Sequence, residues 1–214
     1  MPEGAPFAVS LELPGWELFW ARLETGPDGG EAAASLGALR QATAARARAE
    51  LDLEGLAAHP TAAALRRLFR AAGCDPTRYR PSSEALLRRV LKGEELPAIH
   101  HLVDLNNCLS IALAVPSCVL AEGSFAGPVT LRAGREGEAF ESLRGPFQLA
   151  GKPLLADGDG PFGTPITDSQ RVKVREETRR AWLVAYLPAG VVDAAAAAAA
   201  LAALLAGVPS VRAV

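Results

Sequence analysis

Residues 100–114 read HHLVDLNNCLSIALA, and the character of the chain changes at this stretch. Its leucines recur three or four positions apart, which predicts a helix with one buried face. These leucines are Leu102, Leu105, Leu109 and Leu113. Upstream, long runs rich in Ala, Leu and Arg indicate further helices. Downstream of Pro116, glycines and prolines become frequent and the apolar runs shorten, which is typical of strands and turns.

Strands are predicted on both sides of the helical part. Residues 7–13 alternate apolar and polar side chains, which favours a strand, whereas residues 16–23 fit a strand or a helix. After Pro116, short apolar runs predict strands, and Asp193 caps an Ala-rich C-terminal helix. The runs are residues 129–131, 147–149, 153–155, 171–174 and 181–187. Helices and strands grouped in this way favour an α+β fold over a doubly wound parallel sheet.

Composition limits the class of protein. The chain has 214 residues, half of them apolar, so it can bury a full hydrophobic core. Its net charge of -2 argues against a protein wrapped broadly in nucleic acid, but is compatible with a local basic patch. Residues 1–10 lack a signal-peptide pattern, and no apolar run is long enough to cross a bilayer. We therefore expect a cytoplasmic protein with no membrane partner.

Three segments occur in an order and spacing typical of one known family. The segments are VDLNNCL at residues 103–109, GPVTLRA at residues 127–133 and GPFGTP at residues 160–165. Pro116 follows the first segment, and Asp168, Ser169 and Thr178 follow the third. Together they resemble the B3/B4 editing domain of the beta chain of phenylalanyl-tRNA synthetase, over roughly residues 80–190.

The resemblance implies a freestanding B3/4-domain protein, with a B3/B4-like mixed sheet packed with helices and a helical N-terminal portion. We expect residues 81–214 to form this domain. Residues 1–80 are expected to supply a strand and a helical portion packed on its core. The two parts are either distinct or one continuous domain.

Two functions remain open. The synthetase domain hydrolyses tyrosine wrongly attached to its tRNA, because the synthetic site separates Tyr from Phe imperfectly. The resemblance therefore implies trans-acting hydrolysis of mischarged aminoacyl-tRNA, without a cofactor. The alternative is a non-catalytic module that binds tRNA, another RNA or an amino acid, because a fold does not fix a function. A polar cavity beside Asn106, Asn107 and Asp168 would favour the enzyme, whereas a space filled by Phe162 or Trp182 would favour the module.

The resemblance also implies pocket residues. Asn106 and Asn107 match a family pair that lines the pocket, and their amides suit a small polar ligand. Asparagines on helices also often satisfy only local backbone groups. The family pattern P-x-H reads Pro116-Ser117-Cys118 here, so a cysteine replaces the histidine. Cys118 is either a nucleophile or, as we favour, a packed core residue.

Asp168 is the closest acidic candidate for the pocket glutamate of the family, and its alternative role is to cap a turn. The glycine-rich segment before it allows a ligand to approach the backbone, although it also fits a plain loop. The predicted substrate-binding residues near this segment are Gly163, Thr164, Ser169 and Thr178.

The densest cationic region spans residues 66–92. Arg66 and Arg70 lie about one turn apart on a predicted helix, and Arg78 and Arg80 flank a tyrosine that offers a stacking surface. These four arginines are the predicted RNA contacts. Helical arginines more often form a solvated face, which is the alternative interpretation.

No metal site is predicted. The adjacent His100 and His101 point in different directions, and the three cysteines lack the spacing of a zinc site. Arg132 could bind a ligand carboxylate or an RNA phosphate, but we favour a structural ion pair with Glu138 or Asp157.

Overall fold

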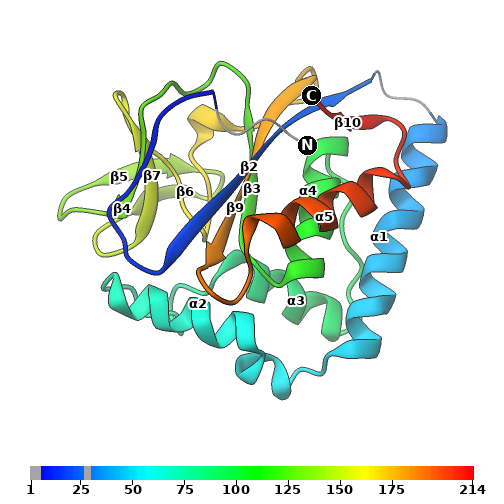
Figure 1. Ribbon diagram of the computed structural model, residues 1–214, viewed down its shortest axis with the longest axis horizontal. Coiled ribbons are helices and arrows are strands. Elements are labelled where there is room, and N and C mark those ends of the chain that lie inside the picture. Colours follow the sequence, from blue (N-terminus) through cyan, green and yellow to red (C-terminus); the bar gives the residue numbers. More distant parts are fainter. Residues whose placement is uncertain (1–5, 27–29) are drawn as a thin grey trace.

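The computed structural model describes residues 6–26 and 30–214, and it has the α+β fold that the sequence predicts (Figure 1). Residues 1–5, the first half of the segment considered for a signal peptide, lie outside this part. So do residues 27–29, which belong to a loop that the sequence Pro-Asp-Gly-Gly predicts over residues 27–30; Gly30 is helical. Two four-stranded sheets, a two-stranded hairpin and five α-helices make up the described part.

The first sheet is antiparallel and has the order β10-β2-β9-β3. Its strands are β2 (Trp16–Thr25), β3 (Ser117–Ala121), β9 (Arg180–Pro188) and β10 (Val211–Ala213). The ambiguous residues 16–23 are therefore strand. They pair with β9 from Trp16 opposite Pro188 to Glu24 opposite Arg180, so the first long strand of the chain joins its last strands.

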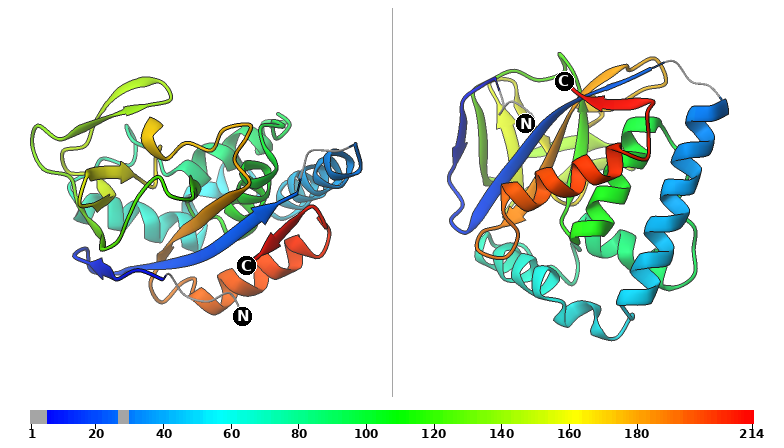
Figure 2. Two further views of the ribbon diagram at one scale, coloured as in Figure 1. Left: turned by 90° about the horizontal axis from the view of Figure 1, so that it is seen from above. Right: turned by 45° about the vertical axis from the view of Figure 1, so that its right-hand side comes forward.

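The second sheet has the order β1-β4-β7-β8, with β1 parallel to β4 and the other pairs antiparallel. Its strands are β1 (Val9–Leu11), β4 (Val129–Ala133), β7 (Pro153–Asp157) and β8 (Gly160–Gly163). The hairpin consists of β5 (Ala139–Ser142) and β6 (Gly145–Gln148). Seen from above, the hairpin and helix α1 lie at opposite ends of the molecule (Figure 2).

The strand predicted over residues 171–174 is wrong. This segment begins with the 3-10 turn η2 (Gln170–Val172), because the Ser169 hydroxyl caps it by accepting a hydrogen bond of 3.2 Å from the Arg171 N–H. Val172 and Val174 suggested a strand, but they lie in an irregular segment. Val172 is buried and Val174 is half-buried, and each packs on a different part of the core.

Strand β9 explains how the layers are held together. Ala181, Leu183 and Ala185 face the helices, whereas Trp182 and Tyr186 face the second sheet. Side chains of a strand alternate between its two faces, so a strand with helices on one side and a sheet on the other is apolar throughout. The aromatic layer between the two sheets is the environment of the candidate site.

The helices cover the other face of the first sheet and one end of the molecule (Figure 1). They are α1 (Gly30–Glu50), α2 (Pro60–Ala71), α3 (Ser82–Leu91), α4 (His101–Leu113) and α5 (Ala194–Leu205), with the short 3-10 helix η1 (Gly55–Ala58) before α2. Helices α4 and α5 pack on the sheet, and α1 packs on α4. Asp193 caps α5 as predicted, since its Oδ1 accepts a 2.7 Å hydrogen bond from the Ala196 N–H.

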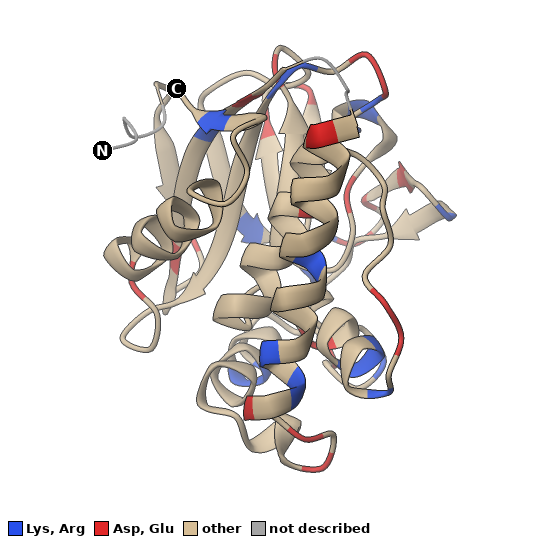
Figure 3. Ribbon diagram, turned by 90° about the vertical axis from the view of Figure 1, so that its right-hand side faces the viewer, with Lys and Arg blue, Asp and Glu red and all other residues tan. Residues whose placement is uncertain are grey.

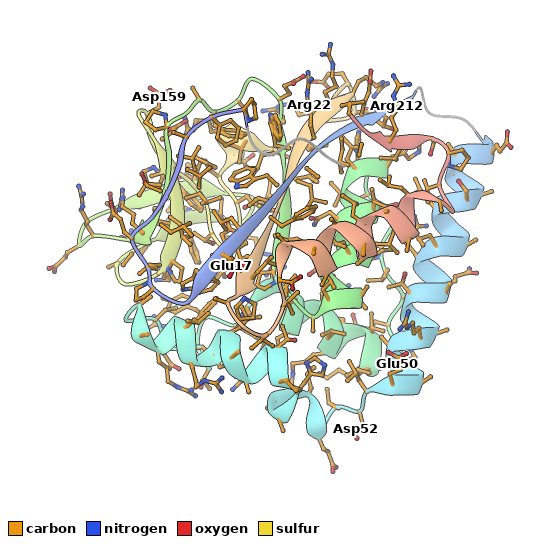
Figure 4. The ribbon with its side chains drawn as sticks, in the orientation of Figure 1. Glu17, Arg22, Glu50, Asp52, Asp159 and Arg212 are labelled. Atoms are coloured by element: carbon orange, nitrogen blue, oxygen red, sulfur yellow. The ribbon has the colours of Figure 1, made fainter. Side chains whose placement is uncertain are left out.

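Charged side chains lie mainly at the periphery. Arg22 and Arg212 project from the same edge, while Glu50 and Asp52 project near the lower end of α1 (Figure 4). None of the described helices combines the length and the apolar character needed to cross a membrane.

Candidate functional site

A buried polar group lies where strands β3, β8 and β9 meet. It consists of the Cys118 thiol, the Tyr186 hydroxyl and the Asp168 carboxyl group, with Gly163 directly beside them. A Cβ atom placed on Gly163 would lie 3.3 Å from Asp168 Oδ1 and 3.4 Å from the Tyr186 hydroxyl oxygen. Both oxygens therefore lie close to the point that a side chain at position 163 would occupy, and a methyl group there would be in tight contact with them.

A short turn places Asp168 beside Gly163 and Tyr186. The Thr164 hydroxyl donates 2.7 Å to the Thr167 carbonyl oxygen and accepts hydrogen bonds from the N–H groups of Ile166 and Thr167. Asp168 then pairs with Gly163 as an antiparallel bridge. Threonine side chains commonly stabilise turns by such bonds, and here the turn folds the acidic side chain back onto β8.

Burial dominates the electrostatics of the group. It raises the pKa of Asp168 to about 7, although the Cys118 thiol and the Thr164 N–H oppose the increase. Burial also raises the pKa of Cys118 and of Tyr186 well above their ordinary values, and the nearby Asp168 carboxylate adds to both effects. At neutral pH the thiol and the phenol are therefore protonated, whereas Asp168 is divided between its two forms.

Two oxygens of this group are unsatisfied. Asp168 Oδ1 and the Tyr186 hydroxyl oxygen are buried and have no hydrogen-bond partner of ordinary geometry among the described residues. Asp168 as a residue is nevertheless only half-buried, so the group lies close to the surface. Unsatisfied buried polar atoms are uncommon in folded proteins and often mark a ligand or water position.

Several predicted site residues meet here, and others do not. Gly163, Thr164 and Ser169 belong to β8 and the turn that carries Asp168. Asn106 links α4 to the start of β3, since its Nδ2 donates a 3.2 Å hydrogen bond to the Ser117 carbonyl oxygen. Its Oδ1 is buried and has no hydrogen-bond partner among the described residues.

Asn107 and Thr178 take other places. Asn107 is half-buried on the next position of α4, so its side chain leaves the helix in a different direction from Asn106. Thr178 closes a turn by accepting a 2.9 Å hydrogen bond from the Arg175 N–H, and its own N–H donates to the Arg175 carbonyl oxygen.

Sequence reasoning missed Tyr186 and Trp20. Both are polar-tipped aromatic residues in apolar strands, and such residues normally read as core. The Trp20 Nε1 atom is also buried without a hydrogen-bond partner among the described residues. A tyrosine in an otherwise apolar strand is a weak signal, because its hydroxyl group must find a partner that the sequence does not reveal.

Aromatic rings fill much of the space around the group. Phe162 is fully buried and stacks on Phe125 with ring centres 5.0 Å apart. Phe7 contacts Trp20 at 5.1 Å and Trp182 at 5.5 Å, both edge to face. These rings pack in the same cluster as Cys118 and Tyr186, and they restrict the size of a side chain that could enter.

The four predicted RNA contacts differ in their availability. The Arg66 guanidinium makes two hydrogen bonds, of 2.7 and 2.8 Å, to the buried Glu84, which also lies 3.3 Å from Arg80. Arg70 and Arg78 form no ion pair among the described residues, and Arg78 lies over the Tyr79 ring at 5.1 Å. On the side that carries α1 and α3, cationic and anionic segments are interspersed rather than gathered in one patch (Figure 3).

Arg132 has the structural role that the sequence favoured. Its guanidinium makes two hydrogen bonds, of 2.7 and 2.8 Å, to Glu138, and this contact lowers the pKa of Glu138 to about 2. Within the described residues, no group of three or more His, Cys, Asp or Glu side chains is placed to hold a metal ion.

The fold and this group define a two-sheet α+β domain with a small polar site beside a glycine-containing turn. The chain belongs to the B3/4 domain family, because the model of that family matches residues 64–202. The family predicted from the three sequence segments is therefore confirmed.

Among solved structures, the chain is similar to an N-terminal fragment of the phenylalanyl-tRNA synthetase beta-subunit from Pyrococcus horikoshii. The similarity covers 99% of this chain and 52% of that fragment, with 12% sequence identity and a TM-score of 0.50. The chain thus spans about half of the fragment, and the similarity concerns the fold alone. No curated protein matches the chain significantly.

Proposed function

We propose that this chain hydrolyses mischarged aminoacyl-tRNA in trans, with the Asp168 group as its reaction site. One observation carries the proposal: a buried carboxyl oxygen that has no hydrogen-bond partner of ordinary geometry among the described residues lies beside the Tyr186 hydroxyl and the Gly163 backbone. A carboxyl group with a pKa of about 7 suits a general base at neutral pH. The predicted tRNA partner and cytoplasmic location belong to the same proposal.

In this proposal, ionised Asp168 accepts a proton from a water molecule that attacks the ester carbonyl carbon. The ester bond to the ribose oxygen breaks, the proton passes to that oxygen, and free amino acid and tRNA leave. The Tyr186 hydroxyl orients the water or the amino acid, because it can donate a hydrogen bond towards the same point.

Cys118 is assigned no nucleophilic role. Attack by cysteine requires the thiolate, and burial raises the pKa of this thiol far above neutrality. The family histidine is therefore replaced by a group that stays protonated and helps to keep Asp168 in place. Arg70 and Arg78 are the proposed tRNA contacts, since Glu84 already holds the other two arginines.

The test is deacylation of a panel of mischarged tRNAs, beginning with Tyr-tRNA(Phe). We expect Asp168→Asn to lower the rate about 100-fold or more, as for loss of a general base. The exposed Glu94→Gln variant serves as the control and should retain the wild-type rate. Folded wild-type protein that hydrolyses none of the panel would refute the proposal.

A second candidate is a binding module without catalysis. The observation that favours it is the aromatic layer, because the fully buried Phe162 leaves little room beside Gly163 for an amino-acid side chain. This candidate predicts that charged and uncharged tRNA bind equally well, and that Asp168→Asn does not alter their affinity.

A further inference from the structure

A second site lies on the far side of helix α4 from Asn106 and β3. It is a cavity of about 620 Å³ between α1, the start of α4 and the segment after η2. Ligand cavities in proteins typically range from about 300 to 1,000 Å³. The volume is therefore large enough for a ligand of metabolite size.

This cavity shares no lining residue with the Asp168 group. One wall comes from Leu36 and Arg40 on α1, which precede residues 64–202 that match the family. The opposite wall comes from residues 173–176. The cavity is thus created by the packing of the N-terminal helix against the family domain.

The cavity is lined by three cationic side chains, of which Arg40 is held in place. Arg40 is held by the nearly fully buried Asp104, whose other carboxyl oxygen accepts a 2.9 Å hydrogen bond from the Ile99 N–H. A guanidinium has five N–H donors, so Arg40 retains donors for a ligand. Lys173 and Arg175 are exposed at the opposite wall and form no ion pair among the described residues.

An apolar surface lies next to these charges. Ile99 is 62% exposed, which is unusual for a large aliphatic side chain, and it lines the cavity together with Leu36 and Val174. The lining therefore combines the exposed apolar side chain of Ile99 with cations on opposite walls. Asp104 is already neutralised by Arg40, which leaves Glu176 as the remaining acid of the lining.

We propose that this cavity binds a nucleoside monophosphate unit, either free or at the end of an RNA chain. The phosphate group lies between Lys173 and Arg175. The Lys173 ammonium group attracts it as a point charge, and the planar Arg175 guanidinium can donate two hydrogen bonds to it. The base packs on Ile99, and Arg40 donates to the sugar or the base. The inference does not depend on the proposed hydrolase function, because it uses none of its residues.

The experiment is isothermal titration calorimetry of the full chain with four probes: AMP, adenosine, inorganic phosphate and a five-nucleotide RNA. We expect AMP or the RNA to bind at least about tenfold more tightly than adenosine and than phosphate, because only they combine both contacts. If AMP binds tightly and the RNA does not, the ligand of the cavity is a free nucleotide. If the RNA binds more tightly than AMP, the ligand is the end of an RNA chain.

The Lys173→Gln/Arg175→Gln double variant should weaken AMP binding about tenfold or more. Ile99→Ser should weaken AMP and adenosine binding without changing phosphate binding. Arg135→Gln/Arg144→Gln removes two exposed cations outside this cavity and outside the cationic region of residues 66–92, and is the matched control. The proposal is overturned if neither AMP nor RNA binds more tightly than adenosine and phosphate, or if the double variant binds them as the wild type does while remaining folded by circular dichroism.

Discussion

Replacement of Asp168 with asparagine should change how the stability of the protein depends on pH. In the folded protein the pKa of this carboxyl group is about 7, whereas an aspartate in the unfolded chain has its ordinary value near 3.8. Between these values the folded state holds a proton that the unfolded state has released. Stability therefore falls as the pH rises through this interval, since the unfolded state binds fewer protons.

The magnitude follows from the interval. The two pKa values of Asp168 differ by about three pH units, and each unit corresponds to about 1.4 kcal/mol. Ionisation of Asp168 thus removes about 4 kcal/mol of unfolding free energy between pH 4 and pH 8. Asparagine is nearly isosteric with the protonated acid and does not titrate. The variant should therefore match the wild type near pH 4 and exceed it by about that amount at pH 8.

The assay is urea unfolding of both proteins at several pH values, with the difference in unfolding free energy plotted against pH. All other groups are the same in both proteins, so their contribution cancels in this difference. The Glu136→Gln variant is the control, because Glu136 is exposed and forms no ion pair among the described residues, and its difference from the wild type should stay small across the same pH range. If the difference in unfolding free energy for Asp168→Asn were also independent of pH, the conclusion that burial raises the pKa of Asp168 would be refuted.

Three further changes test other parts of the structure. Glu84→Gln should cost about 3–5 kcal/mol in urea unfolding, because it leaves two arginines beside a buried site without their carboxylate. Gly134→Ala should lower the melting temperature strongly, since the new methyl group would collide with the Leu149 carbonyl oxygen. The control is Gly158→Ala, whose methyl group contacts no other atom, so its melting temperature should stay within a few degrees of that of the wild type. Asp193→Ala should cost about 1 kcal/mol of unfolding free energy through loss of the α5 cap; an unchanged value would contradict that role.

The long elements could be predicted because each carries a repeated pattern. Helix α4 shows leucines at helical spacing, and β9 is an apolar run of strand length. The short strands β3, β5, β8 and β10 could not be predicted in the same way. Strand β8 reads GPFG, a composition unfavourable for a strand, and it forms because β7 offers it a partner. Pairing between distant segments thus outweighs local preference.

The candidate site could be predicted only in part. Asp168, Cys118 and Gly163 stood out through the family resemblance, and the structure brings them together. Tyr186 did not stand out, because its importance depends on β3 and β8 lying beside it. The α1 cavity gave no sequence signal at all, since Arg40 is separated from its opposite wall by most of the chain.

Strand β2 has a consequence for where this protein can be divided. It comes from the first 25 residues, yet it lies inside the first sheet, between β9 and the C-terminal β10. A fragment cut to the family match at residues 64–202 would lose β2 and β10 and expose one side of β9 along its length. The unpaired backbone groups of such an exposed strand edge pair with other chains, and the protein aggregates. A fragment made for expression should therefore keep residues 1–80 together with residues 81–214, because strands from both ends of the chain complete the first sheet.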